Sequence, residues 1–137
     1  MTDIVVRLKR YIPLRMELEN EQERRKRMQS LETYHKAQMS SLVNSRVDYE
    51  EKPPDWAVAI RNELSDIEQM ISSLEDPLER EVLRMRYIEG DPEKPRPMRW
   101  GDVAHKLYGC KFICDGTRKS LQRTHNSAIE NIKKSHP

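Results

Sequence analysis

The stretch WGDVAHKLYGCKFICDGTRKSLQRTHNSAIENIKK, residues 100–134, contains the features that decide the fold. Its apolar residues recur at helical spacing on either side of Gly109, which predicts a short helix ending there and a longer one from about Thr117 to Lys134. The residues expected to face inward are Trp100, Val103, Ala104 and Leu107 in the first helix and Leu121, Ala128, Ile129 and Ile132 in the second. Because the outer face of the second helix is basic and polar, this outline predicts a helix-turn-helix whose second helix fits a DNA groove.

The composition favours extended or paired helices. Charged residues make up 35% of the 137 residues and hydrophobic residues 36%, and only 4 residues are glycine. Such a chain buries an apolar stripe more easily than a large spherical core. No apolar run approaches the roughly 18 residues that span a bilayer, and the start of the chain has no signal-peptide core, so we expect a cytoplasmic protein with no membrane partner. The 2 cysteines are too few for a disulfide framework.

The charge is distributed unevenly along the chain. Residues 53–98 contain 6 Lys/Arg and 11 Asp/Glu, a net charge of −5, whereas residues 99–137 contain 8 and 3, a net charge of +5. A basic last third predicts an anionic partner for that segment, the alternative being an ordinary solvated surface. The run Glu19–Arg27 is interpreted as a solvated helix face, because glutamates alternate with its arginines; a nucleic-acid patch is the alternative there.

Residues 1–75 are expected to form a long helical hairpin that mediates oligomerisation. The pattern predicts a short helix over residues 3–12, which Pro13 breaks or kinks, and a long helix over residues 14–42. The expected apolar anchors of the long helix are Leu14, Leu18, Met28, Leu31, Ala37 and Leu42. After a polar connection at residues 41–54, a helix carries the heptad-spaced residues Trp56, Ile60, Leu64, Ile67, Ile71 and Leu74. Such a seam needs a partner, either the long helix packed antiparallel or a second chain; we expect the first, with a homodimer or higher oligomer formed through the remaining surface.

A second domain is expected over residues 76–137. Asp76 is predicted to cap a helix, with Pro77 in its first position and Glu79 completing a capping box, and the helix ends at Gly90. Its expected apolar residues are Leu78, Val82, Leu83, Met85 and Tyr87. Three prolines make residues 91–99 irregular. The predicted fold class is therefore all-α, a helical hairpin followed by a helix-turn-helix.

The motifs of the second domain resemble region four of bacterial sigma factors. Residues 79–87 (EREVLRMRY) are similar to its first helix, and residues 100–104 (WGDVA) resemble its second. Thr117 and Arg118 followed by Leu121, His125, Ala128, Ile129 and Ile132 resemble its recognition helix. The connection from Gly109 to Thr117 is longer than the tight turn of that motif. Together with the charged helical hairpin, the chain resembles phage-encoded regulators of the RinA and ArpU type.

This resemblance implies a sequence-specific, double-stranded DNA-binding regulator of transcription in a bacterial host cell, an activator of late or packaging genes. Two alternatives remain open. One is a DNA-packaging recognition subunit of the small-terminase kind, and the other is a sigma-like adaptor that docks on host RNA polymerase without reading DNA. We expect no enzymatic activity and no cofactor. We find no glycine-rich phosphate loop and no catalytic constellation in the sequence.

The DNA contacts are expected on the second helix of the motif and beside it. Arg118, Lys119, Gln122 and Arg123 project from its first turns and are the candidates for base contacts. The candidates for phosphate contacts are Asn126, Lys133, Lys134, Arg99 and Lys111. A zinc site built from Cys110, Cys114, His105 and His125 is disfavoured by the cysteine spacing, so the cysteines are interpreted as small residues that pack the connection.

Overall fold

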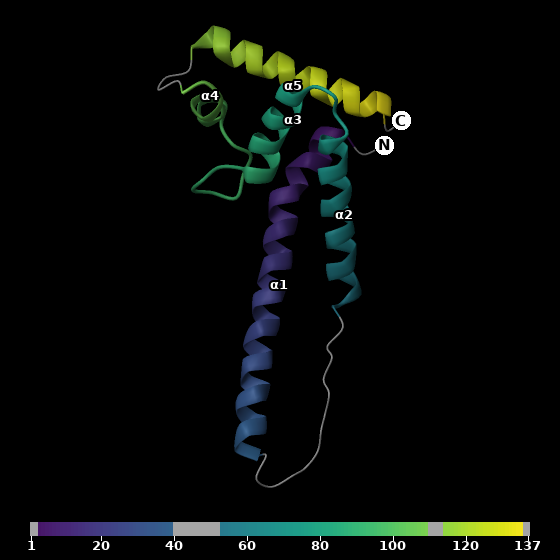
Figure 1. Ribbon diagram of the computed structural model, residues 1–137, viewed down its shortest axis with the longest axis vertical. Helices are drawn as coiled ribbons and strands as arrows, with labels where there is room; N and C mark the ends of the chain where they lie inside the picture. Colours follow the sequence, from purple (N-terminus) through teal and green to yellow (C-terminus); the bar gives the residue numbers. More distant parts are fainter. Residues whose placement is uncertain (1–2, 40–52, 110–113, 136–137) are drawn as a thin grey trace.

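All regular structure described by the computed structural model, which covers residues 3–39, 53–109 and 114–135, is helical (Figure 1). The elements are α1 (Ile4–Met39), α2 (Asp55–Ser72), α3 (Pro77–Leu83), the π-helical turn η1 (Arg84–Glu89), α4 (Trp100–Tyr108) and α5 (Asp115–Ser135). The predicted all-α class and the long N-terminal helix are confirmed in these ranges. None of the described helices is long and apolar enough to cross a membrane.

The first two helices form the predicted antiparallel hairpin (Figure 1). At about 1.5 Å per residue, the 36 residues of α1 extend about twice as far as the 18 residues of α2, so α2 covers only the N-terminal half of α1. Polar contacts at the rim of the seam supplement its apolar packing. Arg7 forms a bidentate pair with Glu63, at 2.9 and 3.0 Å, and the hydroxyl of Tyr11 donates to Glu68.

Of the two effects predicted for Pro13, a break or a kink, the break is wrong, because α1 continues through this residue. Proline removes the one hydrogen bond that its amide would donate to the carbonyl of Lys9. Both Lys9 and Pro13 are exposed, so water can solvate that carbonyl, while Leu8 and Ile12 on the opposite side are buried. Packing of the buried side therefore keeps the helix continuous across the proline.

The apolar seam of α2 is confirmed except at its first position. Leu64, Ile67, Ile71 and Leu74 are buried, and Ile60 packs against the same core at partial burial. Trp56, however, is 46% exposed, because the residues of α1 that lie beside it, Glu17, Asn20, Glu21 and Arg24, are polar.

The far half of α1 is more exposed than the anchor pattern predicted. Met28 and Leu31 are exposed, whereas Leu18 is buried. Leu42 lies outside the described residues, and the expected homodimer or higher oligomer stays a prediction.

Local signals set the bounds of α3 and η1. The carboxylate of Asp76 accepts a hydrogen bond from the amide of Leu78 at 2.9 Å, which confirms the predicted cap. Leu78 itself is exposed. The last turn widens into a π-helix closed by a bond from the amide of Gly90 to the carbonyl of Met85. Gly90 then ends the helix with a φ of 72° and a ψ of −173°.

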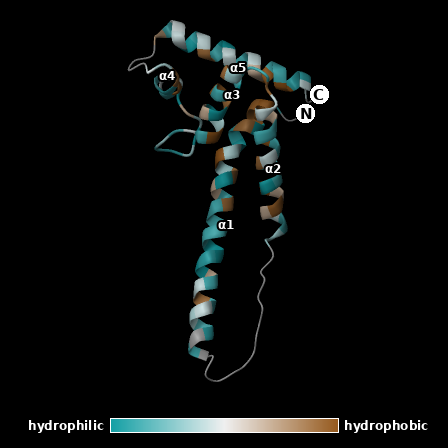
Figure 2. Ribbon diagram, viewed as in Figure 1, coloured by the Kyte–Doolittle hydropathy of each residue, from teal (hydrophilic) through white to brown (hydrophobic). Residues whose placement is uncertain are grey.

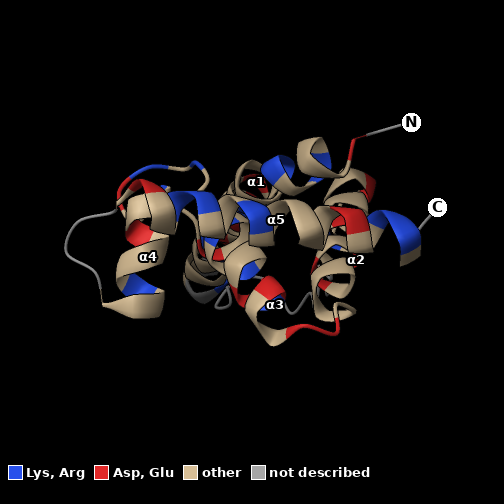
Figure 3. Cartoon of the chain, turned by 90° about the horizontal axis from the view of Figure 1, so that it is seen from above, with Lys and Arg blue, Asp and Glu red and all other residues tan. Residues whose placement is uncertain are grey.

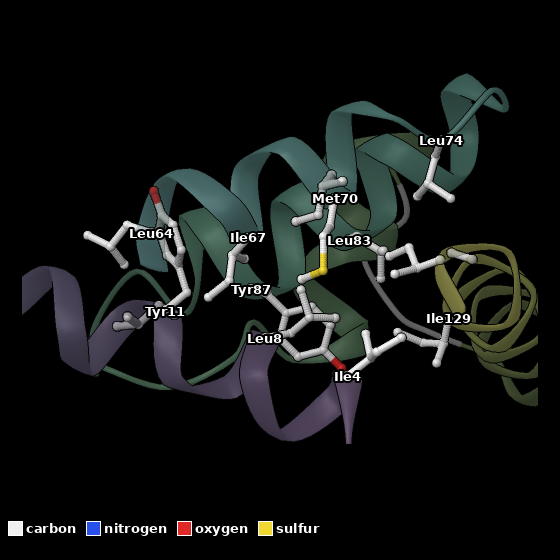
Figure 4. Packing of buried hydrophobic residues seen from close by; sticks show 14 of the residues in the cluster. Ile4, Leu8, Tyr11, Leu64, Ile67, Met70, Leu74, Leu83, Tyr87 and Ile129 are labelled. Atoms are coloured by element: carbon white, nitrogen blue, oxygen red, sulfur yellow. The ribbon is translucent and has the colours of Figure 1, made fainter. Parts of the chain in front are cut away.

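One core joins the two predicted domains. Figure 2 shows the apolar segments gathered where α1, α2 and α3 meet beneath α5, while the middle of α1 is hydrophilic. In Figure 4, Ile4 and Leu8 of α1 meet Ile129 of α5, with Leu83 and Tyr87 between the helices. A smaller cluster consists of Val82, Met98, Val103, Ala104 and Leu121. Residues before and after position 75 therefore pack in the same interior.

Candidate nucleic-acid interface

The inner face of α5 is the one expected from the sequence. Leu121, Ala128, Ile129 and Ile132 are all buried. Leu121 packs with α4 in the smaller cluster, while the other three belong to the main core. The helix begins at Asp115, two residues before the expected start, and the thiol of Cys114 accepts a hydrogen bond from the amide of Thr117 at 3.4 Å. Since Cys114 is exposed, the expected packing role of this cysteine is wrong.

The buried side chain of His125 links α5 to η1 and α4. The hydroxyl of Tyr87 lies 2.6 Å from Nε2 of His125, and the ring of Trp100 meets the imidazole edge-on. Burial lowers the pKa of His125, and the nearby charges of Arg86 and Lys9 lower it further, whereas the hydrogen bond that Nδ1 of His125 donates to Oδ1 of Asn126 raises it. The neutral imidazole is thus favoured as a structural link between η1, α4 and α5.

A second polar link comes from Glu79, which was expected to form a capping box. Its buried carboxylate instead accepts hydrogen bonds from Ser127, at 2.7 Å, and from Asn131, at 3.0 and 3.1 Å, on the side of α5 that faces α3. The three bonds join residues that lie 48 and 52 positions apart in the sequence, so no local pattern marks them. With the histidine link, they fix the rotation of α5 about its own axis.

The segment 91–99, here called the arginine loop, is irregular as predicted but tightly organised. The carboxylate of Asp91 accepts hydrogen bonds from the amides of Glu93 and Lys94, at 2.8 and 3.3 Å, and from Nε of Arg96 at 2.8 Å. The Glu93 amide and the Arg96 guanidinium lower the pKa of Asp91 to about 2. Arg99 stands 3.9 Å from the same carboxylate. One carboxylate therefore orders the loop and directs two arginines.

An open groove of about 1000 Å³ lies between the first turns of α1, the arginine loop, α4 and α5. The cations that line it are Lys9, Arg86, Arg96, Arg99 and Arg118, and Asp102 is the carboxylate among its lining residues. Trp100, Gln122 and His105 complete the walls. Arg86 is held in place by the face of Trp100, 4.1 Å away, and by a 2.7 Å bond to the carbonyl of Met98. Seen from above in Figure 3, basic residues of α1, the arginine loop and α5 lie along one side of the molecule.

The structure brings together some of the predicted contact residues. Arg99, Arg118 and Gln122 line the groove, and all three are exposed. Lys119, Arg123 and Asn126 are exposed on the same helix, although Oδ1 of Asn126 lies 3.2 Å from Nδ1 of His125.

The remaining predicted contacts lie elsewhere. Lys133 pairs with Glu130 at 3.5 Å. Lys134 lines a different pocket, of about 400 Å³, together with Glu75, Asp76 and Glu79. Lys111 is outside the described residues.

Three groove cations were missed from the sequence. Lys9 was assigned to the hairpin, and Arg86 and Arg96 were not singled out. Only the fold brings these residues beside α5. In the described part of the chain, no group of three His, Cys, Asp or Glu side chains could hold a metal ion. Cys110 lies outside that part, and His125 is engaged with Tyr87.

No protein-family model, curated protein or solved structure matches this chain. The function is therefore argued from the geometry of the groove and of α5.

Proposed function

We propose that the protein binds double-stranded DNA through α5 and its flanks and acts as a transcription regulator. The observation that carries this proposal is the exposed face of α5: Arg118, Lys119 and Arg123 project from a helix whose opposite face is anchored by the core. Among the described residues, none of these three cations takes part in an ion pair. Unpaired cations on a rigid helix suit an anionic polymer.

The arrangement of α4 and α5 supports the interpretation of these two helices as a helix-turn-helix. α4 is a short helix that crosses α5 steeply (Figures 1 and 3). α4 packs on η1, and α5 packs on α3. In such motifs the second helix enters the major groove and its first turns meet the base edges. Arg118 and Gln122 lie one turn apart near the start of α5, where an arginine can read guanine and a glutamine adenine.

We further propose that the helix-turn-helix is of the sigma-region-four kind and that the protein regulates phage late or packaging genes as a homo-oligomer. The motif order and the core that joins η1, α4 and α5 support this reading. RNA polymerase of the host is a further candidate partner. The cytoplasm of the host cell is where such a regulator acts.

The test begins with selection of preferred sequences from a random duplex library, followed by fluorescence anisotropy on the selected duplex. Arg118→Ala and Arg123→Ala should each weaken binding to it by about 1–3 kcal/mol, roughly five- to 150-fold. Arg61→Ala is the matched control, because it removes an equal charge from the exposed side of α2. If no sequence is enriched and the wild-type protein shows no salt-dependent affinity for duplex DNA, the proposal is wrong.

A further inference from the structure

The groove between α1 and α5 has no role if only the outer face of α5 touches DNA. We propose that a sugar-phosphate strand of the duplex lies in this groove, with Lys9 of α1 as one of its phosphate contacts. The helical hairpin is then part of the DNA interface and not only a platform. This inference rests on the proposed function and names a second surface for it.

The charge of the groove suits a polyanion. Five cations and one carboxylate are among the side chains that line it. Two of the cations are already held, Arg86 by Trp100 and Arg96 by Asp91. Lys9 and Arg118 form no ion pair within the described residues, and Arg99 forms only the long one at 3.9 Å. Lys9 and Arg99 are therefore free to meet phosphates from two different elements of the fold, and Arg118 is free to contact DNA where the groove meets the start of α5.

The position of Lys9 relative to α5 is fixed before DNA arrives. Ile4 and Leu8, in the turns around Lys9, are buried in the same cluster as Ile129 (Figure 4). Farther along α1, Arg15 donates to the carbonyl of Ile88 at 2.7 Å. Such preorganisation lowers the entropy lost when a contact residue is ordered on binding. A lysine on a freely moving hairpin would not have this advantage.

The shape of the groove favours a strand over a small ligand. Pockets for small molecules enclose most of the ligand surface, whereas this groove is more open than enclosed. The groove is also continuous with the surface of α5 that is proposed to contact bases, since Arg118 and Gln122 line the groove and belong to the first turns of α5. A strand that passes through the groove thus brings its neighbouring bases to the start of α5.

The experiment measures affinity for a mixed-sequence duplex by anisotropy over a range of salt concentrations. Lys9→Ala is compared with Lys26→Ala, which removes the same charge from the exposed far half of the same helix. Each phosphate contact contributes roughly 0.9 to the slope of log K against log salt. Loss of one contact should therefore lower that slope by about 0.9 and weaken binding about eightfold at about 0.1 M salt. Lys26→Ala should change neither quantity.

The outcomes separate this inference from the proposed function. If the wild-type protein and Lys26→Ala bind alike and only Lys9→Ala loses slope and affinity, the strand passes over α1. If Lys9→Ala binds as the wild type does while Arg123→Ala, at a residue of α5 that does not line the groove, is weakened, DNA binding stands and the groove contact is wrong. If the wild type does not bind the duplex at all, the proposed function fails. If inorganic phosphate displaces the duplex far beyond its effect on ionic strength, the groove takes a small anion and the inference is overturned.

Discussion

Gly90 connects η1 to the arginine loop, and its replacement by alanine tests the packing at this point of the chain. Its φ of 72° and ψ of −173° belong to a region that residues with a side chain rarely enter. A Cβ atom placed on Gly90 would overlap the side chain of Ile12 and would lie 2.9 Å from the carbonyl oxygen of Arg96. Both neighbours are constrained, since Ile12 is buried in the main core and Arg96 belongs to the loop ordered by Asp91.

The expected loss of stability in Gly90→Ala has two contributions, the backbone conformation and the overlap with Ile12. The backbone conformation alone costs about 1–3 kcal/mol for a residue with a side chain. Forcing an extra carbon into the packed contact with Ile12 adds about 1–3 kcal/mol. Gly90→Ala should therefore lower the free energy of unfolding by about 2–6 kcal/mol. Gly109→Ala is the matched control: its φ is 70°, but an added Cβ meets nothing within 4 Å, so only the left-handed backbone conformation costs, by about 1–2 kcal/mol.

The assay is urea unfolding followed by circular dichroism, on both variants and the wild type. If the free energy of unfolding falls by the same amount in the two alanine variants, Gly90 does not lie against the side chain of Ile12. A second readout is DNA affinity at a temperature where both variants are folded. Because the carbonyl of Arg96 must move in Gly90→Ala, this variant should also bind duplex DNA more weakly than Gly109→Ala.

Three further changes probe the polar links. Tyr87→Phe leaves Nε2 of His125 buried without its partner and should destabilise the protein by about 1–3 kcal/mol in urea unfolding, whereas Tyr34→Phe, at an exposed tyrosine, should change stability by less than about 0.5 kcal/mol. Because burial lowers the pKa of His125, its imidazole binds a proton more tightly in the unfolded chain than in the folded protein. Stability should therefore fall as the pH drops below the ordinary pKa of 6.5. A His125→Gln variant whose stability has the same pH profile as the wild type would contradict the structural role of the neutral imidazole. The pKa of Asp91 is lowered to about 2, so its contribution is complete above about 3.8 and is lost as the pH falls to about 2; the stability of Asp91→Asn should vary less than that of the wild type over this interval in acid-unfolding measurements.

The ends of the helices were predictable because the signals that set them are local. Asp76 caps α3 with its own carboxylate, and Gly90 and Gly109 end their helices with positive φ angles. Each signal acts over a few residues and does not depend on what packs nearby. The inward stripe of α5 was predictable for a similar reason, since its spacing records which side of the helix meets the core.

The errors arose where distant parts of the chain decide the outcome. Pro13 carries the same local signal as any helix breaker, but burial of Leu8 and Ile12 keeps α1 continuous. Trp56 occupies a seam position, yet the residues of α1 that lie beside it are polar and leave it exposed. Glu79 is correctly spaced for a capping box, but it bonds to Ser127 and Asn131 of α5 instead. In each case a neighbour far away in sequence outweighs the local preference.

The features of the candidate interface also fall into two groups, those set by local sequence and those set by tertiary packing. The sequence by itself determined the helical class, the bounds of most helices and the basic outer face of α5, because helical periodicity and capping are encoded over short ranges. Only the tertiary structure decided which cations share a surface. It brings Lys9 of α1 and Arg96 of the arginine loop beside Arg118, and it places Lys134 among acidic side chains. The physical reason is that a common core of α1, α2, η1 and α5 sets these distances, and no sequence pattern records which faces of separate helices will meet.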